Sequence, residues 1–117
     1  MTGLLNILRI FAAVGTIATG LLSLVKPEAV YGFTGLRAEG GRGITEIRSI
    51  FGAFFIGLGV MALVFRAPQP YAMLGVTYLL TGVVRLISMF VDHSVVQSNI
   101  ISVIVEIVFG IILVIPI

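Results

Sequence analysis

Residues 71–91 read YAMLGVTYLLTGVVRLISMFV and contain a single charged residue, Arg85. A helix of this length rises about 30 Å, at about 1.5 Å per residue, which is the thickness of the hydrocarbon core of a bilayer. The stretch is therefore predicted to be a membrane-spanning helix. Arg85 would then lie within the membrane, where a charged group is costly and is kept only with partners or water.

Three further apolar runs of similar length flank this helix. They cover residues 4–25, 44–65 and 97–117. The connections at residues 66–70 and 92–94 are too short for a wide crossover between spans. The sequence thus predicts an all-α, integral membrane four-helix bundle of up-down-up-down topology, in which residues 1–117 form a single transmembrane domain. Both termini would lie on the same side of the membrane.

The remaining connection, residues 27–43, is the longest. Pro27 and Glu28 suit the first turn of a short helix, because proline needs no backbone donor there and an acid favours the positive end of the helix dipole. The apolar residues that follow, including Tyr31, would place this helix at the membrane interface. Residues 35–43 are polar and glycine-rich, which favours a loop.

The composition agrees with a membrane protein. Hydrophobic residues make up 59% of the chain and charged residues 10%, whereas water-soluble domains are about one quarter charged. Most of the surface is therefore expected to face lipid. The seven basic and five acidic residues form no run of like charge, so nucleic-acid binding is not predicted. The lack of cysteine excludes disulfides and thiolate metal sites.

Small residues recur at every fourth position in two of the predicted spans. They are Ala12, Thr16 and Gly20 in the first span, and Ala53 and Gly57 in the second. Small side chains at this spacing let two helix backbones approach closely. We expect these positions to serve helix packing.

A stripe of polar residues runs along the predicted third helix. Its members are Tyr78, Thr81, Arg85, Ser88 and Asp92, which lie three, four, three and four residues apart. This spacing places them on one face of a helix. The stripe predicts a polar surface that extends from within the membrane to the turn after the helix.

Two other predicted helices carry polar residues in the same half of the membrane. The fourth helix has Asn99, Ser102 and Glu106, and the second begins with Glu46 and Arg48. In an up-down bundle, the start of the second span, the end of the third and the start of the fourth meet on one side. These residues are therefore predicted to join the polar stripe of the third helix in one network.

The rise of a helix gives the expected depth of each charge. Arg48 would lie about 6 Å below its loop, Arg85 about 10 Å and Glu106 about 13 Å. We therefore expect Glu106 to face Arg85, with Arg48 nearer the rim. Asp92 and His93 would lie at the mouth of the site.

Two interpretations of the pair formed by Arg85 and Glu106 remain open. It is either an ion pair that fixes which helices are neighbours, or part of a site for a ligand or a proton. Buried ion pairs add little net stability, which favours a function. Glu46 and Arg48 are also explained by side chains that extend to the interface. No metal site and no cofactor is expected, because the acidic residues and His93 lack the helical spacing that preforms a ligand set.

Three segments resemble an uncharacterised bacterial membrane family, the domain of unknown function four-three-four-five. They are residues 45–59 (TEIRSIFGAFFIGLG), 85–92 (RLISMFVD) and 105–110 (VEIVFG). The resemblance covers nearly the whole chain, and one departure is His93, where glycine is expected after the aspartate. The family is more distantly similar to the DoxX-like four-helix membrane proteins, some of which accompany quinone-linked or redox membrane enzymes.

The resemblance implies a four-helix fold and a place in the inner membrane of a bacterium, but no established activity. It also supports five charged residues as family-type positions. These are Glu46, Arg48, Arg85, Asp92 and Glu106.

The first functional hypothesis is a binding or accessory protein. Arg48 and Arg85 would hold the polar head of a lipid-like or quinone-like ligand, or the bundle would dock beside a larger membrane complex. Apart from the lipid bilayer, a second copy of the chain is a further candidate partner, because four helices leave a broad apolar perimeter.

Two alternatives belong to other classes. A small proton-coupled transporter would use Glu106 as the proton carrier, although small multidrug exporters place a key glutamate in the first span and this chain has none there. A membrane enzyme would use Glu106 or Asp92 as a general base. The enzyme is the less favoured hypothesis, because no Ser-His-acid set, phosphate loop or metal-binding helix motif is present.

Overall fold

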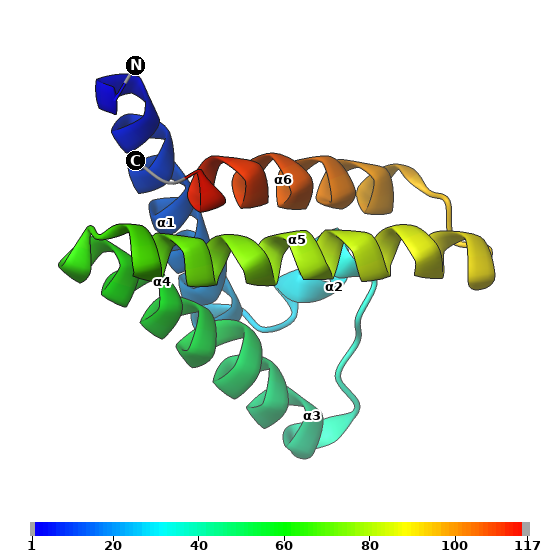
Figure 1. The fold of residues 1–117 in the computed structure, drawn as a ribbon. Coiled ribbons are helices and arrows are strands. Elements are labelled where there is room, and N and C mark those ends of the chain that lie inside the picture. Colours follow the sequence, from blue (N-terminus) through cyan, green and yellow to red (C-terminus); the bar gives the residue numbers. More distant parts are fainter. Residues whose placement is uncertain (1, 116–117) are drawn as a thin grey trace. The chain divides into compact units, whose positions relative to one another are not determined.

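The elements of the fold are all helical. The structure, a computed structural model, describes residues 2–115 and contains no strand within them (Figure 1). In chain order the helices are α1 (Thr2–Val25), α2 (Ala29–Thr34), α3 (Gly40–Glu46), the π-helical segment η1 (Ile47–Phe54), α4 (Phe55–Phe65), α5 (Pro68–Val91) and α6 (Gln97–Val114). Because α3, η1 and α4 follow one another without a break, they form one long helical run.

Four stretches within the described residues are long and apolar enough to cross a membrane. They are Gly3–Val25, Gly40–Phe65, Pro68–Val91 and Gln97–Val114. This confirms the prediction of an all-helical protein in which four helices are long and apolar enough to cross a membrane. The residues that form them are mostly apolar and face outward, as expected of a chain whose solvent is lipid.

The ends of all four predicted spans differ from those of the helices, and α1 begins at Thr2, two residues before the predicted start. The second span was expected to begin at residue 44 and the third at residue 71, but the helices begin at Gly40 and Pro68. Gly40 has a φ of +75°, which turns the chain into the helix, and Pro68 needs no backbone donor in a first turn. Helix α6 ends at Val114, and residues 116 and 117 of the predicted fourth span lie outside the described residues.

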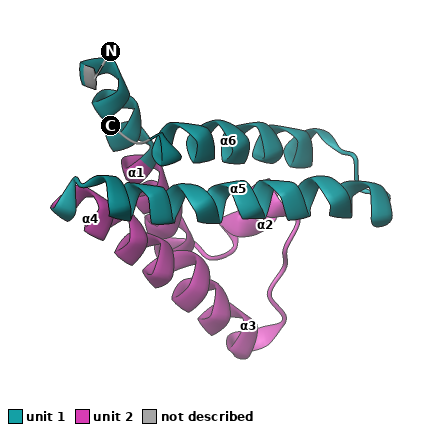
Figure 2. Ribbon diagram, in the orientation of Figure 1, with its two compact units in different colours: residues 1–12, 65–117 teal, residues 13–64 magenta. Residues whose placement is uncertain are grey.

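The helices divide into two compact units (Figure 2). The terminal unit consists of residues 1–12 and 65–117, and the central unit consists of residues 13–64. Helix α1 contributes its first half to the terminal unit and its second half to the central unit. Each unit has its own set of close helix contacts.

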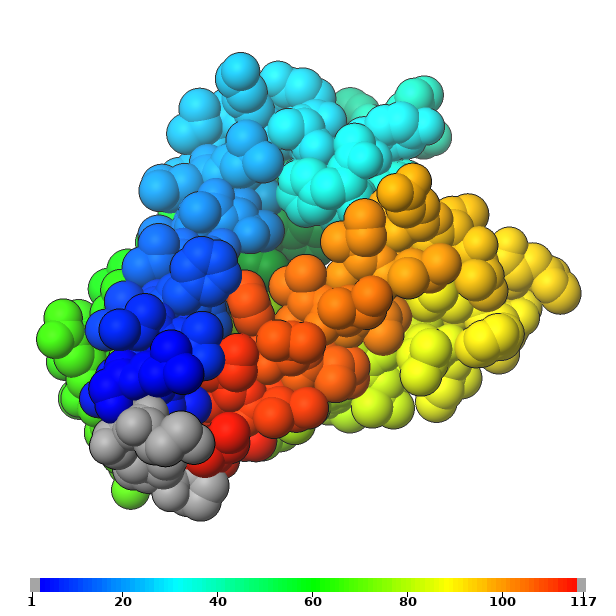
Figure 3. Space-filling view, turned by 90° about the horizontal axis from the view of Figure 1, so that it is seen from above, coloured from blue at the N-terminus to red at the C-terminus, as the bar shows by residue number. Residues whose placement is uncertain are grey.

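In the terminal unit, α5 and α6 form an antiparallel hairpin, and Figure 3 shows α6 lying along α5. Three glycines make this contact close. A Cβ atom added to Gly75 would lie 2.9 Å from the carbonyl oxygen of Gly110, and one added to Gly82 would meet the side chain of Ile107 at 2.8 Å. The hairpin is therefore held at a distance that only small residues allow.

In the central unit, the second half of α1 packs antiparallel to η1 and α4. A Cβ atom on Gly20 would lie 2.7 Å from the carbonyl oxygen of Gly52, and one on Gly59 would lie 2.8 Å from the carbonyl oxygen of Ala13. Gly20 thus has the packing role predicted for it. On the second helix, however, the contact uses Gly52 and Gly59, whereas the predicted Gly57 has no atom within 4 Å of its added Cβ.

The spacing of these glycines accounts for this difference. Gly52 and Gly59 are seven residues apart and share one face of the helical run, whereas Gly57, two residues before Gly59, lies on another face. The predicted Ala53 is accordingly exposed.

The predicted short helix in the first connection is present as α2. Backbone donors of Ala29 and Val30 bond to the carbonyls of Lys26 and Pro27, and Gly35, with a φ of +74°, ends the helix. Val30 is buried, whereas the guanidinium of Arg37 lies 4.5 Å from the centre of the exposed Tyr31 ring. The placement of this helix at a membrane interface stays a prediction.

Candidate functional site

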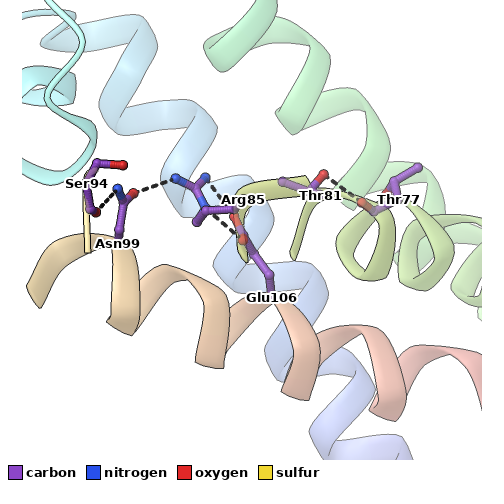
Figure 4. Close-up of polar contacts among 6 residues, drawn as sticks. All are labelled: Thr77, Thr81, Arg85, Ser94, Asn99 and Glu106. Atoms are coloured by element: carbon purple, nitrogen blue, oxygen red, sulfur yellow. Dashed lines mark hydrogen bonds and ion pairs between the residues drawn. The ribbon is translucent and has the colours of Figure 1, made fainter. Parts of the chain in front are cut away.

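An ion pair between α5 and α6 lies at the centre of the candidate site (Figure 4). Arg85 donates from Nε to Oε1 of Glu106 and from Nη2 to Oε2, both at 2.9 Å. The two parallel bonds match the planar fork of the guanidinium to the carboxylate, which is the strongest geometry for such a pair. The predicted pairing of these two residues is confirmed.

Asn99 extends this pair toward the turn between the helices. Arg85 Nη1 donates to Oδ1 of Asn99 at 3.1 Å, and Asn99 Nδ2 donates to the backbone carbonyl of Ser94 at 3.0 Å. The side chain of Arg85 is thus directed along the hairpin toward its closed end. The turn that follows α5 is tied to the charged pair through one amide side chain.

The pair is only partly shielded. The side chain of Glu106 is 12% exposed and that of Arg85 is 28% exposed. Glu106 therefore lies on the inner side of the pair, and Arg85 forms its accessible face. Because the two charges cancel, the pair places a strong hydrogen-bond donor within a predicted span without adding a net charge.

An open groove of about 550 Å³ runs beside Arg85, and its lining belongs to the terminal unit. Its polar lining consists of Thr81, Arg85, Ser88, Asp92, Ser94 and Asn99. Its apolar lining consists of Leu80, Val84 and Met89. The groove therefore combines polar groups with hydrocarbon walls, the combination that binds a molecule with a polar head and an apolar body.

The structure brings together most of the polar stripe predicted on the third helix. Thr81, Ser88 and Asp92 line the groove with Arg85. Tyr78 instead packs its ring edge-on against Phe109, with the ring centres 5.5 Å apart. Tyr78 therefore belongs to the packing between α5 and α6, because its aromatic ring finds a partner on the facing helix.

Other predicted residues lie outside the groove. Ser102 is half-buried and is not part of its lining. Glu46 and Arg48 belong to the central unit, where Glu46 accepts a hydrogen bond from Arg42 at 2.5 Å and both partners are exposed. The participation of Glu46 and Arg48 in one network with Arg85 stays a prediction.

His93 lies in the turn after α5, is exposed, and has a φ of +53°. Among residues 2–115, no three histidine, aspartate or glutamate side chains gather as a metal site requires. The groove offers hydrogen-bonding groups and charged groups in its lining.

Arg9 is a buried charge that the sequence pattern did not single out. It is 2% exposed, donates from Nη2 to the backbone carbonyl of Ile115, and lies with its guanidinium 5.3 Å from the centre of the Tyr71 ring. A cation at the carbonyl end of α6 favours the negative end of the helix dipole. Arg9 thus joins the first half of α1 to the hairpin. The sequence feature that could have indicated this role is a charged residue inside an apolar run.

The fold and the site together define a small helical protein with four candidate membrane spans and an Arg–Glu pair beside a groove. The family model for a domain of unknown function (DUF4345) matches residues 4–116, and the chain belongs to this family. The family predicted from the sequence is thereby confirmed. Searches of curated proteins and of solved structures found no match.

Proposed function

We propose that this protein is a membrane binding or accessory protein that holds the polar head of an amphiphilic ligand against Arg85. The proposal rests on how many N–H donors of the Arg85 guanidinium already have an acceptor within the protein. Arginine has five N–H donors, and three of them are used by Glu106 and Asn99. Two donors therefore remain for an acceptor in the groove, with no partner among the described residues.

The walls of the groove support an amphiphile over a small polar solute. Leu80, Val84 and Met89 would contact the hydrocarbon part of the ligand, while the hydroxyl groups of Thr81 and Ser88 lie on the same helix as Arg85. A lipid-like or quinone-like molecule has both parts. Proton transport has less support, because both carboxylate oxygens of Glu106 are engaged by Arg85.

Native mass spectrometry of the protein, purified in mild detergent from its own membranes, tests whether a ligand is bound. We expect a bound amphiphile or a stoichiometric partner protein in the wild type. The double variant Arg85→Met/Glu106→Leu should lose at least tenfold of the bound amphiphile, because it removes the donors while keeping the site neutral.

Lys26→Met is the matched control, since Lys26 is an exposed cation of the central unit. It should retain the ligand at the wild-type level. A wild-type protein that carries neither amphiphile nor partner, or a double variant that binds as well as the wild type, would contradict the proposal.

We further propose that the four spans form an up-down-up-down bundle in the inner membrane of a bacterium, with DoxX-like relatives and both termini on one side. Support comes from the antiparallel contacts within each unit and from the short connections. The chain has no cysteine, so single cysteines can be introduced and labelled from either side. Gln69→Cys and Asn6→Cys should react from one side, and Glu39→Cys and Ser94→Cys from the other; any other distribution would refute this topology.

A further inference from the structure

We infer that the groove selects an amphiphile with a zwitterionic head, in which a phosphate accepts from Arg85 and an ammonium group meets Asp92. This inference rests on the proposed function. It specifies the charge of the ligand's head group, which we infer from the charged residues that line the groove.

The charge balance disfavours an anionic head. The positive charge of Arg85 is already cancelled by Glu106 in a two-bond pair. The other charged group in the lining of the groove is the carboxylate of Asp92. The site therefore has donors for an acceptor but a net negative charge, and an anion without a cationic group would be repelled.

Asp92 lies at a helix end that is unfavourable for a negative charge. It is the C-cap residue of α5, where the helix dipole presents its negative end, and the last turn of this helix has no basic residue. The carboxylate is exposed and has no hydrogen-bond or ion-pair partner among residues 2–115. The neighbouring His93 is also exposed. An ammonium group from a ligand would offset both the unpaired carboxylate and the dipole.

The two ends of the site lie on the same face of one helix. Arg85 and Asp92 are seven residues apart, so their Cα atoms lie on one face of α5, about 10 Å apart along its axis. The guanidinium extends toward Asn99 at the start of α6, which shortens this gap (Figure 4). Ser88 lines the groove between them and offers a hydroxyl group to a phosphate ester oxygen.

The test compares two lipids that differ in the ammonium group alone. Phosphatidylethanolamine and phosphatidylglycerol with identical acyl chains are titrated against the detergent-solubilised, delipidated protein, and bound lipid is measured by native mass spectrometry. The ethanolamine head should bind about fivefold more tightly, the effect of one exposed ion pair. In Asp92→Asn this preference should fall below about twofold, while binding of the glycerol head is retained.

Asp92→Asn should fold normally, because it removes a carboxylate from an unfavourable helix end. Glu39→Gln, which removes an exposed carboxylate of the central unit, should keep the full preference. Equal binding of the two heads, tighter binding of the glycerol head, or a preference that survives Asp92→Asn would overturn the inference.

The outcomes also separate this inference from the function on which it rests. If both lipids bind in an Arg85-dependent way without preference, the zwitterion inference fails and the proposed function stands. If neither lipid binds, and the wild type purified from its own membranes also carries no amphiphile or partner, both fail.

Discussion

Glu106→Leu is expected to lower the free energy of unfolding by about 3 kcal/mol, the low end of the cost of breaking a buried ion pair. The variant leaves the Arg85 guanidinium without its carboxylate, next to an apolar helix surface. The low end applies because Arg85 is 28% exposed and can reach the groove. Arg85→Met should cost a similar amount, because it strands Glu106, which is the more buried partner at 12% exposed. Unfolding by a denaturing detergent in mixed micelles measures both losses.

The double variant Arg85→Met/Glu106→Leu is the decisive comparison. Since it strands neither charge, it should unfold within about 1 kcal/mol of the wild type. If the double variant lost as much free energy of unfolding as the two single variants together, the two side chains would act independently. The ion pair would then contribute nothing to stability. Near-wild-type stability of the double variant together with loss of ligand would assign the pair to binding.

Gly75→Ala is expected to destabilise the hairpin of α5 and α6 by about 2 kcal/mol, within the range for overpacking a close contact. The new methyl group would lie 2.8 Å from the Cβ of Leu113 and 2.9 Å from the carbonyl oxygen of Gly110. The Gly110 oxygen is a backbone atom of α6, and the Leu113 Cβ is bonded directly to that backbone. Neither atom can rotate away, so the clash is relieved only if the helices separate. The same denaturation assay measures the loss.

Two other glycines calibrate this result. Gly82→Ala should lose less, because its nearest neighbour is the terminal carbon of the flexible Ile107 side chain. Gly57→Ala should be neutral or up to about 1 kcal/mol more stable, since nothing lies within 4 Å and alanine favours the helix. A loss at position 57 as large as that at position 75 would show that the assay reports helix composition and not the contact between α5 and α6.

Much of the candidate site was predictable from the sequence. A polar stripe on one helix and a glutamate on the next were enough to predict that Arg85 faces Glu106, because a short turn forces the two helices to be antiparallel neighbours. The same reasoning indicated Thr81, Ser88 and Asp92. It included Tyr78 on spacing alone, although the ring of this residue packs against Phe109. Spacing predicts which face a residue occupies, but the partner depends on the side chains of the facing helix.

The local sequence established the helical class, the four apolar spans and the family, because hydrophobicity and length are properties of a segment that need no partner. The tertiary structure decided which glycines meet, since the face of the second helical run that packs against α1 carries Gly52 and Gly59 and not Gly57. It also directed Arg9 to the end of α6 and Arg85 toward Asn99. Such choices depend on the rotation of each helix about its own axis and on the rotamers that its neighbours allow, and neither is encoded in a periodic pattern.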